Sequence, residues 1–378
     1  MMDGDSRKPL GKGAFDLCAH CPDLCLDRCP VVTATGSTTF SPYGKMLTAY
    51  LLDRERMAPS LDAMRALYQC TGCLSCHDGC RHEVDVPAAL CEIRSRLVEQ
   101  GVRPFDQALF EMDQTLLAQA LARTVPERYQ VPDAQAVLFP GCAALLKNPS
   151  LILDLFASFD ALDIRFVAAA PEAALCCGYP LHAAGYRSAF REQATRVVAA
   201  LRRYKVVVAL SPCCAHTLKN LYAAAGVTFT PRVVLALELM APLIQRMQRP
   251  PLELRAAYHD SCFLGRHLGL QDMPRQVLSH VLGQPPLELR RNRRDAVCCG
   301  AGGAWERVSE EAARRAAANV LAMAKDAGAT TLVSGSTNCA AHMASVATDP
   351  VEVLDFLTVI ARWLGKDGRP PRRKPGRK

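Results

Sequence analysis

The residues best able to carry chemistry in this sequence are its cysteines, of which there are 18 among 378 residues. Four of them fall within eleven residues, at the spacing C-x2-C-x2-C-x3-C. This spacing winds three consecutive thiols around one side of a cubane four-iron cluster and directs the fourth thiol away, toward a second cluster. The four residues are Cys70, Cys73, Cys76 and Cys80.

A second run of four cysteines lies upstream, as a two-cluster arrangement requires, and comprises Cys18, Cys21, Cys25 and Cys29. In crossed ligation the last cysteine of each run joins the other cluster, which predicts two 4Fe-4S clusters with four thiolates each. One cluster takes Cys18, Cys21, Cys25 and Cys80, and the other takes Cys29, Cys70, Cys73 and Cys76. The first run is unusual in having three residues between its second and third cysteines, where two are common.

Zinc is the main alternative to iron, because closed tetrahedral zinc sites also begin from C-x2-C pairs. Zinc sites normally separate two such pairs by a hairpin and do not compress four ligands into so short a run. A disulfide framework is disfavoured, because the first residues, Met1 to Asp5, contain no apolar stretch for secretion. We therefore expect reduced thiols and a cytoplasmic protein, with peripheral attachment at the inner membrane face as a further option.

The formal net charge of +8 is concentrated at the end of the sequence. Residues 366–378 contain seven basic residues and one acidic residue, so they account for six of the eight positive charges. The remainder is close to neutral, and no nucleic-acid partner is expected. The basic, proline-rich tail is expected to be disordered; it could touch anionic lipid or an acidic partner, or have no role. No apolar run reaches the roughly 18 to 20 residues needed to cross a bilayer.

Residues 1–131 are expected to form a helical, ferredoxin-like two-cluster domain without strands. Ser60 is placed to cap one helix, and Pro87 opens a second helix that Gly101 ends. A third helix is predicted over about residues 105–121. Cys91 lies on the second helix, outside both runs, and is interpreted as a core thiol.

From residue 132 onward, apolar strands alternate with helices, which indicates a mostly parallel sheet covered by helices. Strands are predicted at residues 136–139, 164–167 and 206–210. Cysteines follow the strands, at the carboxyl ends where open α/β sheets bind their ligands. These cysteines are Cys142, Cys176, Cys177, Cys213 and Cys214.

The same layout recurs further along, with strands predicted at residues 255–259 and 331–333. Three cysteines of the first set match three later ones at offsets of 120, 122 and 125 residues. This internal duplication predicts two similar α/β lobes, residues 132–250 and 251–365, packed about a pseudo-twofold axis. The second lobe contributes Cys262, Cys298, Cys299 and Cys339.

Each lobe contains a Cys-Cys-Gly sequence. Two adjacent cysteines point their side chains in different directions, so one metal ion rarely uses both, whereas the iron atoms of a cluster are spread widely enough. Gly178 and Gly300 let the backbone pass close to such a cluster. We therefore expect one or two further iron-sulfur clusters, or zinc, in the lobes.

These features together resemble the iron-sulfur proteins with two cysteine-rich Cys-Cys-Gly domains, over about residues 14–360. That family includes the B subunit of heterodisulfide reductase, the iron-sulfur subunit of glycolate oxidase, the C subunit of anaerobic glycerol-3-phosphate dehydrogenase and lactate-utilisation proteins. The heterodisulfide reductase members imply a non-cubane 4Fe-4S cluster in each lobe, bound through five cysteines. Besides the two cysteine runs, the resemblance rests on FPGC at 139–142, CCGYP at 176–180, YHDSCFLGRH at 258–267 and CCGAGG at 298–303.

The second lobe departs from that pattern, because it offers four thiols where the first lobe offers five. His216 and His342 each lie three residues after a lobe cysteine, Cys213 and Cys339. Each histidine could replace a missing thiolate or simply donate a hydrogen bond. A site with four ligands could hold a different cluster, zinc, or nothing durable.

Basic residues near the second-lobe thiols leave several roles open, and the sequence assigns no catalytic residue. His259 and His267 flank Cys262, and they could supply protons or be structural. An arginine-rich loop before Cys298 could dock an acidic partner or an anionic substrate, stabilise a cluster, or be solvated. Its arginines are Arg290, Arg291, Arg293 and Arg294.

The resemblance implies an electron-transferring iron-sulfur subunit of a flavin-dependent dehydrogenase that acts on a 2-hydroxy acid or on glycerol 3-phosphate. A separate flavoprotein would be its partner, because the sequence has no glycine-rich dinucleotide fingerprint opening a βαβ unit. Electrons would pass to a quinone, through a membrane partner, or to another acceptor. Two alternatives are an enzyme that reduces a disulfide at a lobe cluster and a zinc-holding assembly factor that binds a client protein.

Overall fold

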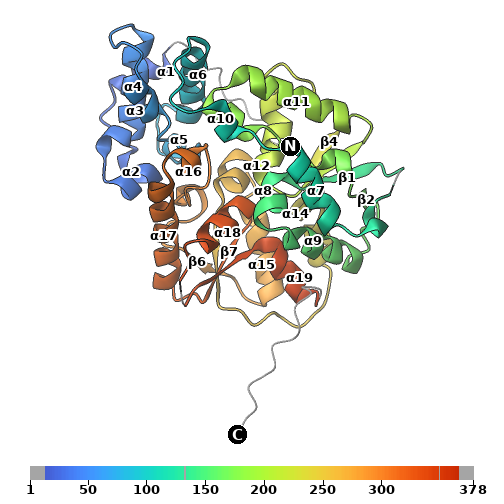
Figure 1. Cartoon of the computed structure of the whole chain (residues 1–378). Helices are drawn as coiled ribbons and strands as arrows, with labels where there is room; N and C mark the ends of the chain where they lie inside the picture. Colours follow the sequence, from blue (N-terminus) through green and yellow to red (C-terminus); the bar gives the residue numbers. More distant parts are fainter. Residues whose placement is uncertain (1–12, 132, 349, 366–378) are drawn as a thin grey trace.

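The computed structural model describes residues 13–131, 133–348 and 350–365. Figure 1 shows a helical part, coloured blue, lying beside two α/β lobes. The basic tail, residues 366–378, lies outside the described residues, so its predicted disorder and contacts stay predictions.

The helical part contains no strand among its described residues, as predicted. Ser60 caps α4 by accepting a hydrogen bond from the Ala63 amide at 3.2 Å. The helix predicted over residues 105–121 is wrong in its bounds, because Asp113 accepts hydrogen bonds from two amides and starts a separate helix. The helices are α1 (Ala14–Ala19), α2 (Pro30–Thr35), α3 (Pro42–Asp53), α4 (Leu61–Leu67), α5 (Ser75–Asp78), α6 (Val86–Glu99) and α7 (Gln114–Thr124).

Each lobe is built on a four-stranded parallel sheet, in the order β2-β1-β3-β4 in the first lobe and β6-β5-β7-β8 in the second. The central strands are buried, apart from the half-buried Val206 at the start of β3, and they are rich in valine, leucine and alanine, as strands covered on both faces require. The strands are β1 (Ala136–Phe139), β2 (Val167–Ala168), β3 (Val206–Ala209), β4 (Arg232–Leu235), β5 (Ala256–His259), β6 (Leu287–Glu288), β7 (Thr331–Ser334) and β8 (Glu352–Asp355).

Helices cover both sheets (Figure 1). In the first lobe they are α8 (Gly141–Lys147), α9 (Ser150–Ala161), α10 (Tyr179–Ala184), α11 (Arg187–Leu201), α12 (Pro212–His216), α13 (Tyr222–Ala224) and α14 (Ala236–Ile244). In the second lobe they are η7, a π-helical turn (Phe263–His267), α15 (Asp272–Leu282), α16 (Trp305–Val308), α17 (Glu310–Asp326), α18 (Thr337–Ala344) and α19 (Phe356–Trp363).

Edge strands differ from the sequence prediction. The strand expected at residues 164–167 is only Val167–Ala168, because Phe166 turns outward and is 55% exposed. The strands β4, β6 and β8 were not predicted, and β6 has only two residues. The other two, β4 and β8, share one feature. Each begins with an exposed charged residue, Arg232 or Glu352, and runs directly into a helix, so its apolar stretch is short.

The two lobes pack on each other reciprocally. Helix α9 of the first lobe packs against α19, which closes the second lobe, and α15 of the second lobe packs against α14, which closes the first. The sheets have the same strand order, and the matched helices exchange partners. This arrangement is that of a duplicated domain packed about a pseudo-twofold axis.

The hydrophobic core runs from the helical part into the first lobe without interruption. Tyr68 donates a hydrogen bond to the Ala184 carbonyl at 2.5 Å, which joins α4 to the end of α10. On the other side α2 packs against α17, where Arg315 donates to the Ala34 carbonyl at 2.7 Å. The helical part is therefore fastened to both lobes.

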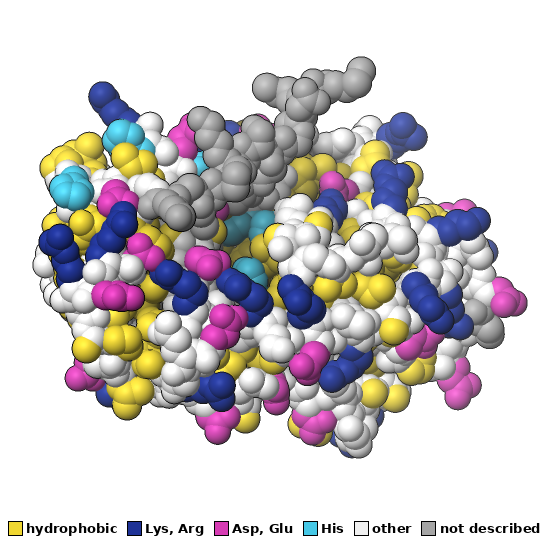
Figure 2. Space-filling model, turned by 90° about the horizontal axis from the view of Figure 1, so that it is seen from above, with side chains coloured by type: hydrophobic (Ala, Val, Ile, Leu, Met, Phe, Trp, Pro, Cys, Tyr) yellow, Lys and Arg dark blue, Asp and Glu magenta, His cyan; other side chains and the backbone are white. Residues whose placement is uncertain are grey.

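The surface carries charges of both signs. Basic and acidic side chains lie interspersed over the face shown in Figure 2. Within the described ranges no helix is by itself long and apolar enough to span a bilayer, although the bent pair α8 and α9 together meets the length and composition.

Candidate metal centres

Four half-buried cysteines come together at the surface of the helical part, and we call them the outer quartet. Helix α1 carries the first, and the following loop turns at Asp23, whose φ is 56°, to bring in two more. Burial, together with neighbouring thiols, raises the pKa of Cys18 and of Cys25 to about 12. Thiols with so high a pKa lose their protons near neutral pH only when a positively charged metal binds the sulfur atoms. The outer quartet is Cys18, Cys21, Cys25 and Cys80.

Four buried cysteines lie deeper, and we call them the inner quartet. Gly72 and Leu74 both adopt left-handed backbone conformations, with φ of 69° and 61°, and this loop gathers three of the thiols around one pocket. The inner quartet is Cys29, Cys70, Cys73 and Cys76. The eight cysteines thus fall into the two sets that crossed ligation requires, while the ligation itself stays a prediction.

Lys45 lies against the inner quartet and was not singled out from the sequence. Only 1% of its surface is exposed, its Nζ lies 3.7 Å from Cys29 Sγ, and it donates to the Gln69 carbonyl at 2.6 Å. Burial alone would lower its pKa, but the thiols of the inner quartet outweigh burial and raise it. The sequence did contain a sign that Lys45 is buried, because it shares the apolar face of α3 with Ala49 and Leu52.

The loop of the inner quartet packs directly against the CCGAGG segment of the second lobe. A Cβ atom on Gly302 would lie 2.8 Å from the Thr71 carbonyl oxygen, and one on Gly303 would overlap the Cys70 carbonyl. Gly302 and Gly303 are therefore needed for this close approach, in addition to any role that they have near the thiols.

Side chains of the YHDSCFLGRH motif hold the same loop. His267 Nε2 lies 2.8 Å from the Gly72 carbonyl oxygen, and Arg266 Nε donates to the Cys73 carbonyl at 2.6 Å. The Cys73 thiol is hydrogen-bonded to the thiol of Cys298 in the second lobe. The inner quartet and the second-lobe thiols are therefore in direct contact.

The five predicted thiols of the first lobe converge at the carboxyl ends of its strands. Cys176 Sγ lies 3.9 Å from Cys142 Sγ. Hydrogen bonds with Cys176, and then with Cys213 and Cys214, lower the pKa of Cys177 well below its ordinary value. The hydrogen bond with Cys176 also lowers the pKa of Cys142, so two thiols of this set, one of them in the Cys-Cys pair, are held ready to become thiolates.

The four predicted thiols of the second lobe converge in the same way. Hydrogen bonds with Cys262, then with Cys299 and Cys73, lower the pKa of Cys298 well below its ordinary value. Cys339 completes the set through its contact with Cys299. Each lobe therefore has one thiol of lowered pKa within its Cys-Cys pair.

An amide takes the place of the fifth thiol in the second lobe. Asn338 precedes Cys339 as Cys213 precedes Cys214, and it lines the same cavity as the thiols. His342, a candidate replacement ligand, turns away, because its Nε2 lies 3.0 Å from the Ala313 carbonyl oxygen. The other candidate, His216, has its Nδ1 2.9 Å from the Asn220 side-chain amide nitrogen.

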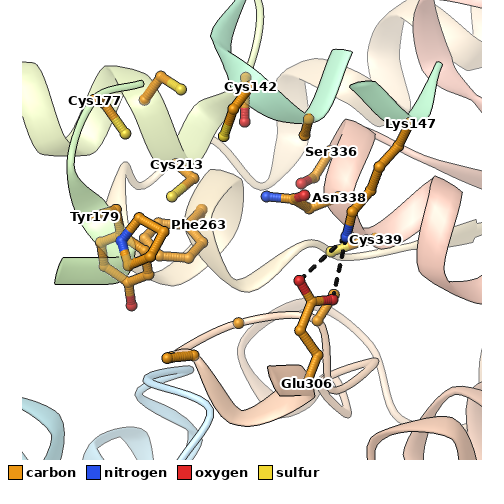
Figure 3. Close-up of a pocket in the computed structure, with 18 of the residues that line it drawn as sticks. Cys142, Lys147, Cys177, Tyr179, Cys213, Phe263, Glu306, Ser336, Asn338 and Cys339 are labelled. Atoms are coloured by element: carbon orange, nitrogen blue, oxygen red, sulfur yellow. Dashed lines mark hydrogen bonds and ion pairs between the residues drawn. The ribbon is translucent and has the colours of Figure 1, made fainter. Parts of the chain in front are cut away.

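One cavity of about 200 Å³ lies between the lobes. In Figure 3 the labelled first-lobe cysteines lie across it from Cys339, with Tyr179 and Phe263 beside them. The rings of Tyr179 and Phe263 meet edge to face, with centroids 5.0 Å apart. The sequence predicted one separate site in each lobe, whereas in the structure thiols of both lobes line this one cavity. The cysteines that line the cavity are Cys142, Cys177, Cys213, Cys214, Cys262, Cys298, Cys299 and Cys339.

An ion pair bridges the lobes at this cavity. Lys147 Nζ from α8 lies 3.1 Å from Glu306 Oε1 of α16, as the dashed lines in Figure 3 show. Their side chains are 42% and 20% exposed, so the pair is in contact with solvent. Ser336 and Asn338 add polar groups further in. A small molecule entering the cavity from this side meets the ion pair first.

The four sets of thiols fit iron-sulfur groups. None of the 18 cysteines, all of which the structure describes, forms a disulfide. Over the described ranges, no group of three or more His, Cys, Asp or Glu side chains converges as a single metal ion requires. Sets made only of thiols are the usual ligands of iron-sulfur clusters.

The arginine-rich loop before Cys298 ties the second lobe to the helical part. Arg291 donates to the Asp27 carbonyl at 3.0 Å, and Arg294 Nη2 lies 3.1 Å from Asp78 Oδ1. Arg293 pairs with Asp272 of the second lobe, so three of the four arginines singled out from the sequence bind within the chain, and two of these three reach the helical part.

Two further side chains lie outside the thiol sets. His259 is held between the Ser334 hydroxyl and the Val297 carbonyl, each at 3.2 Å, and burial lowers its pKa. Cys91 was interpreted as a core thiol; it donates to the His182 carbonyl at 3.0 Å and so links α6 to α10. Both contacts fasten elements together.

Family comparisons agree with these sites. A model described as a cysteine-rich domain matches residues 136–219 and 256–344, and one described as a 4Fe-4S dicluster domain matches residues 14–84. The dicluster match includes all eight cysteines of the outer and inner quartets, and the two cysteine-rich matches include the nine lobe thiols. Iron-sulfur clusters are therefore the cofactors of this chain.

Three relatives illustrate the similarity. The chain is 27% identical to the D subunit of dihydromethanophenazine:CoB–CoM heterodisulfide reductase of Methanosarcina acetivorans, over 93% of this chain and 94% of that one. It is 25% identical to the B subunit of fumarate reductase (CoM/CoB) of Methanothermobacter marburgensis, over 74% of this chain but only 57% of that one. It is 33% identical to EtfAB:quinone oxidoreductase of Syntrophomonas wolfei, over 36% of this chain and 20% of that one.

These relatives are oxidoreductases or their subunits, and the domains match in the same order as the thiol sets in the structure. The chain therefore belongs to the iron-sulfur oxidoreductase subunits that join a 4Fe-4S dicluster domain to two cysteine-rich domains.

Proposed function

We propose that this chain is the iron-sulfur subunit of a flavin-dependent dehydrogenase. A separate flavoprotein oxidises a 2-hydroxy acid or glycerol 3-phosphate, and its electrons enter this chain one at a time at the outer quartet. They leave in pairs at the cavity between the lobes, to a quinone that takes up two protons or to another two-electron acceptor.

The order of the thiol sets through the molecule carries this proposal. The outer quartet is half-buried at the surface, the inner quartet is buried behind it, and Cys73 of the inner quartet meets Cys298 at the cavity. Clusters bound at these sets would supply one-electron transfer. An electron carrier needs such a continuous series from an accessible surface to the place of exchange.

The chain's own residues support the two ends of this series. Lys45 places a buried positive charge beside the inner quartet, where each added electron increases the negative charge. Tyr179 and Phe263 fill the space beside the lobe thiols with apolar ring surface and so limit the water there. Lys147 and Glu306 present a pair of charges to whatever enters the cavity.

The relatives support the same class of function. One is named as a quinone oxidoreductase that acts on EtfAB, which agrees with a quinone acceptor and a separate electron donor. This chain has no dinucleotide fingerprint of its own, so the flavin is assigned to a partner subunit.

Anaerobic copurification with the partner tests the proposal. The tagged chain, isolated from its own host, is expected to bring down a flavin-containing subunit. Adding the 2-hydroxy acid or glycerol 3-phosphate should then bleach the visible absorption of the complex and reduce a soluble quinone. The absence of any flavin subunit, or the failure of every such substrate to bleach the complex, would contradict the proposal.

Two variants test the assignment of the path. In Cys298→Ala, substrate should still bleach the visible absorption of clusters at the outer and inner quartets. This variant should reduce no quinone, because the exchange site is lost. Cys76→Ser should bleach only in part and also reduce no quinone, because the inner quartet is lost. Quinone reduction at the normal rate by Cys298→Ala would show that the second lobe is structural.

Disulfide reduction in the cavity is a second candidate. Eight thiols line this one cavity, and the relative that matches nearly the whole chain is named as a heterodisulfide reductase subunit. In that reaction the sulfur–sulfur bond breaks, and the disulfide takes up two electrons and two protons to leave as two thiols. Release of two thiols per small disulfide, driven by reduced viologen and absent in Cys298→Ala, would favour it. Quinone reduction without thiol release favours the dehydrogenase subunit.

A further inference from the structure

Arg266 occupies the junction between the inner quartet and the second lobe. It lies on η7, four residues after Cys262, and its guanidinium group reaches toward the helical part. Nε donates to the Cys73 carbonyl at 2.6 Å, and Nη1 donates to the Ala296 carbonyl at 2.9 Å and to the Arg294 carbonyl at 3.2 Å. Two of its three nitrogens are therefore fixed by backbone oxygens of two different parts of the chain.

The third nitrogen of Arg266 has no such acceptor. Nη2 is buried, and none of the described residues accepts a hydrogen bond from it. Leaving a buried charged donor without an acceptor is destabilising, because the group has lost its water and gained no partner. Because the other two nitrogens are well satisfied, the side chain is held in place with Nη2 directed at an acceptor that does not belong to the protein.

The surroundings of Arg266 indicate what that acceptor is. The charged groups that act on it most strongly are the thiols of Cys73, Cys262 and Cys298. Burial lowers its pKa, but these sulfurs outweigh burial and raise it. One sulfur belongs to the inner quartet and two belong to the second-lobe set, so the guanidinium stands between two iron-sulfur sites.

We propose that Arg266 is a positioning residue that sets the reduction potentials of the inner quartet and of the second-lobe site. Its Nη2 donates a hydrogen bond to a sulfur of the group held there, and its permanent charge favours the state with one more electron. The electron comes from the outer quartet or from an added reductant, and no proton has to accompany it. This inference rests on the iron-sulfur ligation proposed above.

The first lobe has a leucine at the position that matches this cation. The residue four positions after Cys142 is Leu146, where Arg266 follows Cys262 by the same interval. Leu146 lines the cavity and is 47% exposed. The proposal therefore predicts unequal lobes, with the second-lobe site the easier to reduce.

Reduction potentials measured on the isolated full chain test the role of Arg266, so that the result does not depend on a flavoprotein or on turnover. An anaerobic titration followed by electron paramagnetic resonance gives a potential for each signal. Cys76→Ser and Cys299→Ser, which remove the inner and second-lobe signals, assign them. In Arg266→Gln the potentials of these two signals should become more negative, while those of the outer quartet and the first lobe stay unchanged.

Two further variants separate charge from folding. Arg266→Lys keeps the positive charge but has no counterpart of Nη2, so its two potentials should shift in the same direction by a smaller amount. Arg290→Gln removes an exposed charge from the same arginine-rich loop and should change nothing. Unchanged potentials in Arg266→Gln with full iron content would overturn the proposal, as would an equal shift of all four signals. If Arg266→Gln binds no iron at the junction, wild-type potentials in Arg266→Lys would overturn it.

Discussion

Asp355 is a buried carboxylate whose protonation is tied to folding. It caps α19 by accepting a hydrogen bond from the Leu357 amide at 2.9 Å, and Thr337 and Asp154 also face it. Burial raises its pKa from 3.8 to about 7. Above pH 4 the unfolded chain releases this proton more readily than the folded chain, so stability is lost as the pH rises toward and through 7.

Asp355→Asn should remove this pH dependence. Between pH 6 and pH 8 the carboxylate should reduce the free energy of unfolding by about 1.4 kcal/mol, since one unit of pKa corresponds to that amount. Urea unfolding of the full chain at the two pH values measures the difference. Between these pH values the asparagine variant should lose about 1.4 kcal/mol less stability than the wild type. An identical loss in both proteins would contradict the assignment.

Single residues also show where prediction from sequence stops. The cysteines were found because thiols at fixed spacing have few other uses. Lys45 was not assigned, although its place on an apolar helix face marked it as buried, because nothing in the sequence shows which thiols it meets. Arg266 was not assigned, because its partners come from another domain. Their roles depend on contacts with Gln69, Cys73 and Cys298, which only the folded chain brings together.

At the scale of elements, the Cys-Cys-Gly loops, which follow the edge strands β2 and β6, are held by the helices behind them. Gly300 has φ of 92°, and a Cβ atom there would lie 2.9 Å from the Ala313 carbonyl oxygen in α17. Gly178 in the first lobe has φ of 83°, but a Cβ atom there would meet only side chains, the nearest being Phe190 at 3.0 Å. The second-lobe loop is therefore the more rigidly packed of the two.

Gly300→Ala should be the more damaging of two matched substitutions. Both variants force alanine into a left-handed conformation, at about 1–2 kcal/mol, but Phe190 can shift in Gly178→Ala while the α17 backbone cannot. Gly300→Ala should therefore lose about 1 kcal/mol more than Gly178→Ala and lose iron from the second lobe. Thermal unfolding and iron analysis measure both, and equal losses would refute this difference in packing.

Asn338→Cys should strengthen the second-lobe site. With four thiols against five, the wild-type second lobe is expected to lose its iron to a chelator before the first lobe does. A fifth thiol in place of Asn338 should slow that loss to a rate near that of the first lobe. Asn220→Cys, at a residue that is not among those lining the cavity, serves as the control for an added thiol. Equal chelation rates of the two wild-type lobes would refute the argument from ligand number.

The fold was predictable from the sequence where a strand is buried and ends in a cysteine. β1, β3, β5 and β7 were found within one or two residues, because each is a short apolar run with a cysteine in the loop or helix start that follows it. β4, β6 and β8 were missed, because these short edge strands are only partly buried and no cysteine directly follows them. The single cavity between the lobes could not be predicted, since it depends on how the duplicated halves pack.

At the scale of the molecule, Trp305 joins the second lobe to the inner quartet. Its ring is fully buried against α2 and α17, and Nε1 donates to the Gln69 side chain at 2.8 Å. The Gln69 carbonyl in turn accepts from Lys45 beside the inner quartet. The position of the inner quartet therefore depends on a side chain of the second lobe, more than 200 residues away.

Trp305→Ala should open this junction. The substitution should lower the free energy of unfolding by about 3–5 kcal/mol, and it should let iodoacetamide modify Cys70 and Cys76 in the iron-free chain, as mass spectrometry would record. Trp363→Ala is the matched control, because this other tryptophan is buried where the lobes meet and donates to the Pro250 carbonyl at 3.1 Å. Protection of both cysteines in Trp305→Ala would contradict this role.

The reciprocal packing of α9 and α19 also bears on how the protein is made. Helix α9 leaves the ribosome early, but the helix that covers it is the last one described, nearly 200 residues later. At roughly 5–20 residues per second, α9 waits on the order of 10–40 s with its apolar face uncovered. The first lobe therefore reaches its final packing only when synthesis has passed α19. Iron that is delivered before then reaches a cavity that the second lobe has not yet completed.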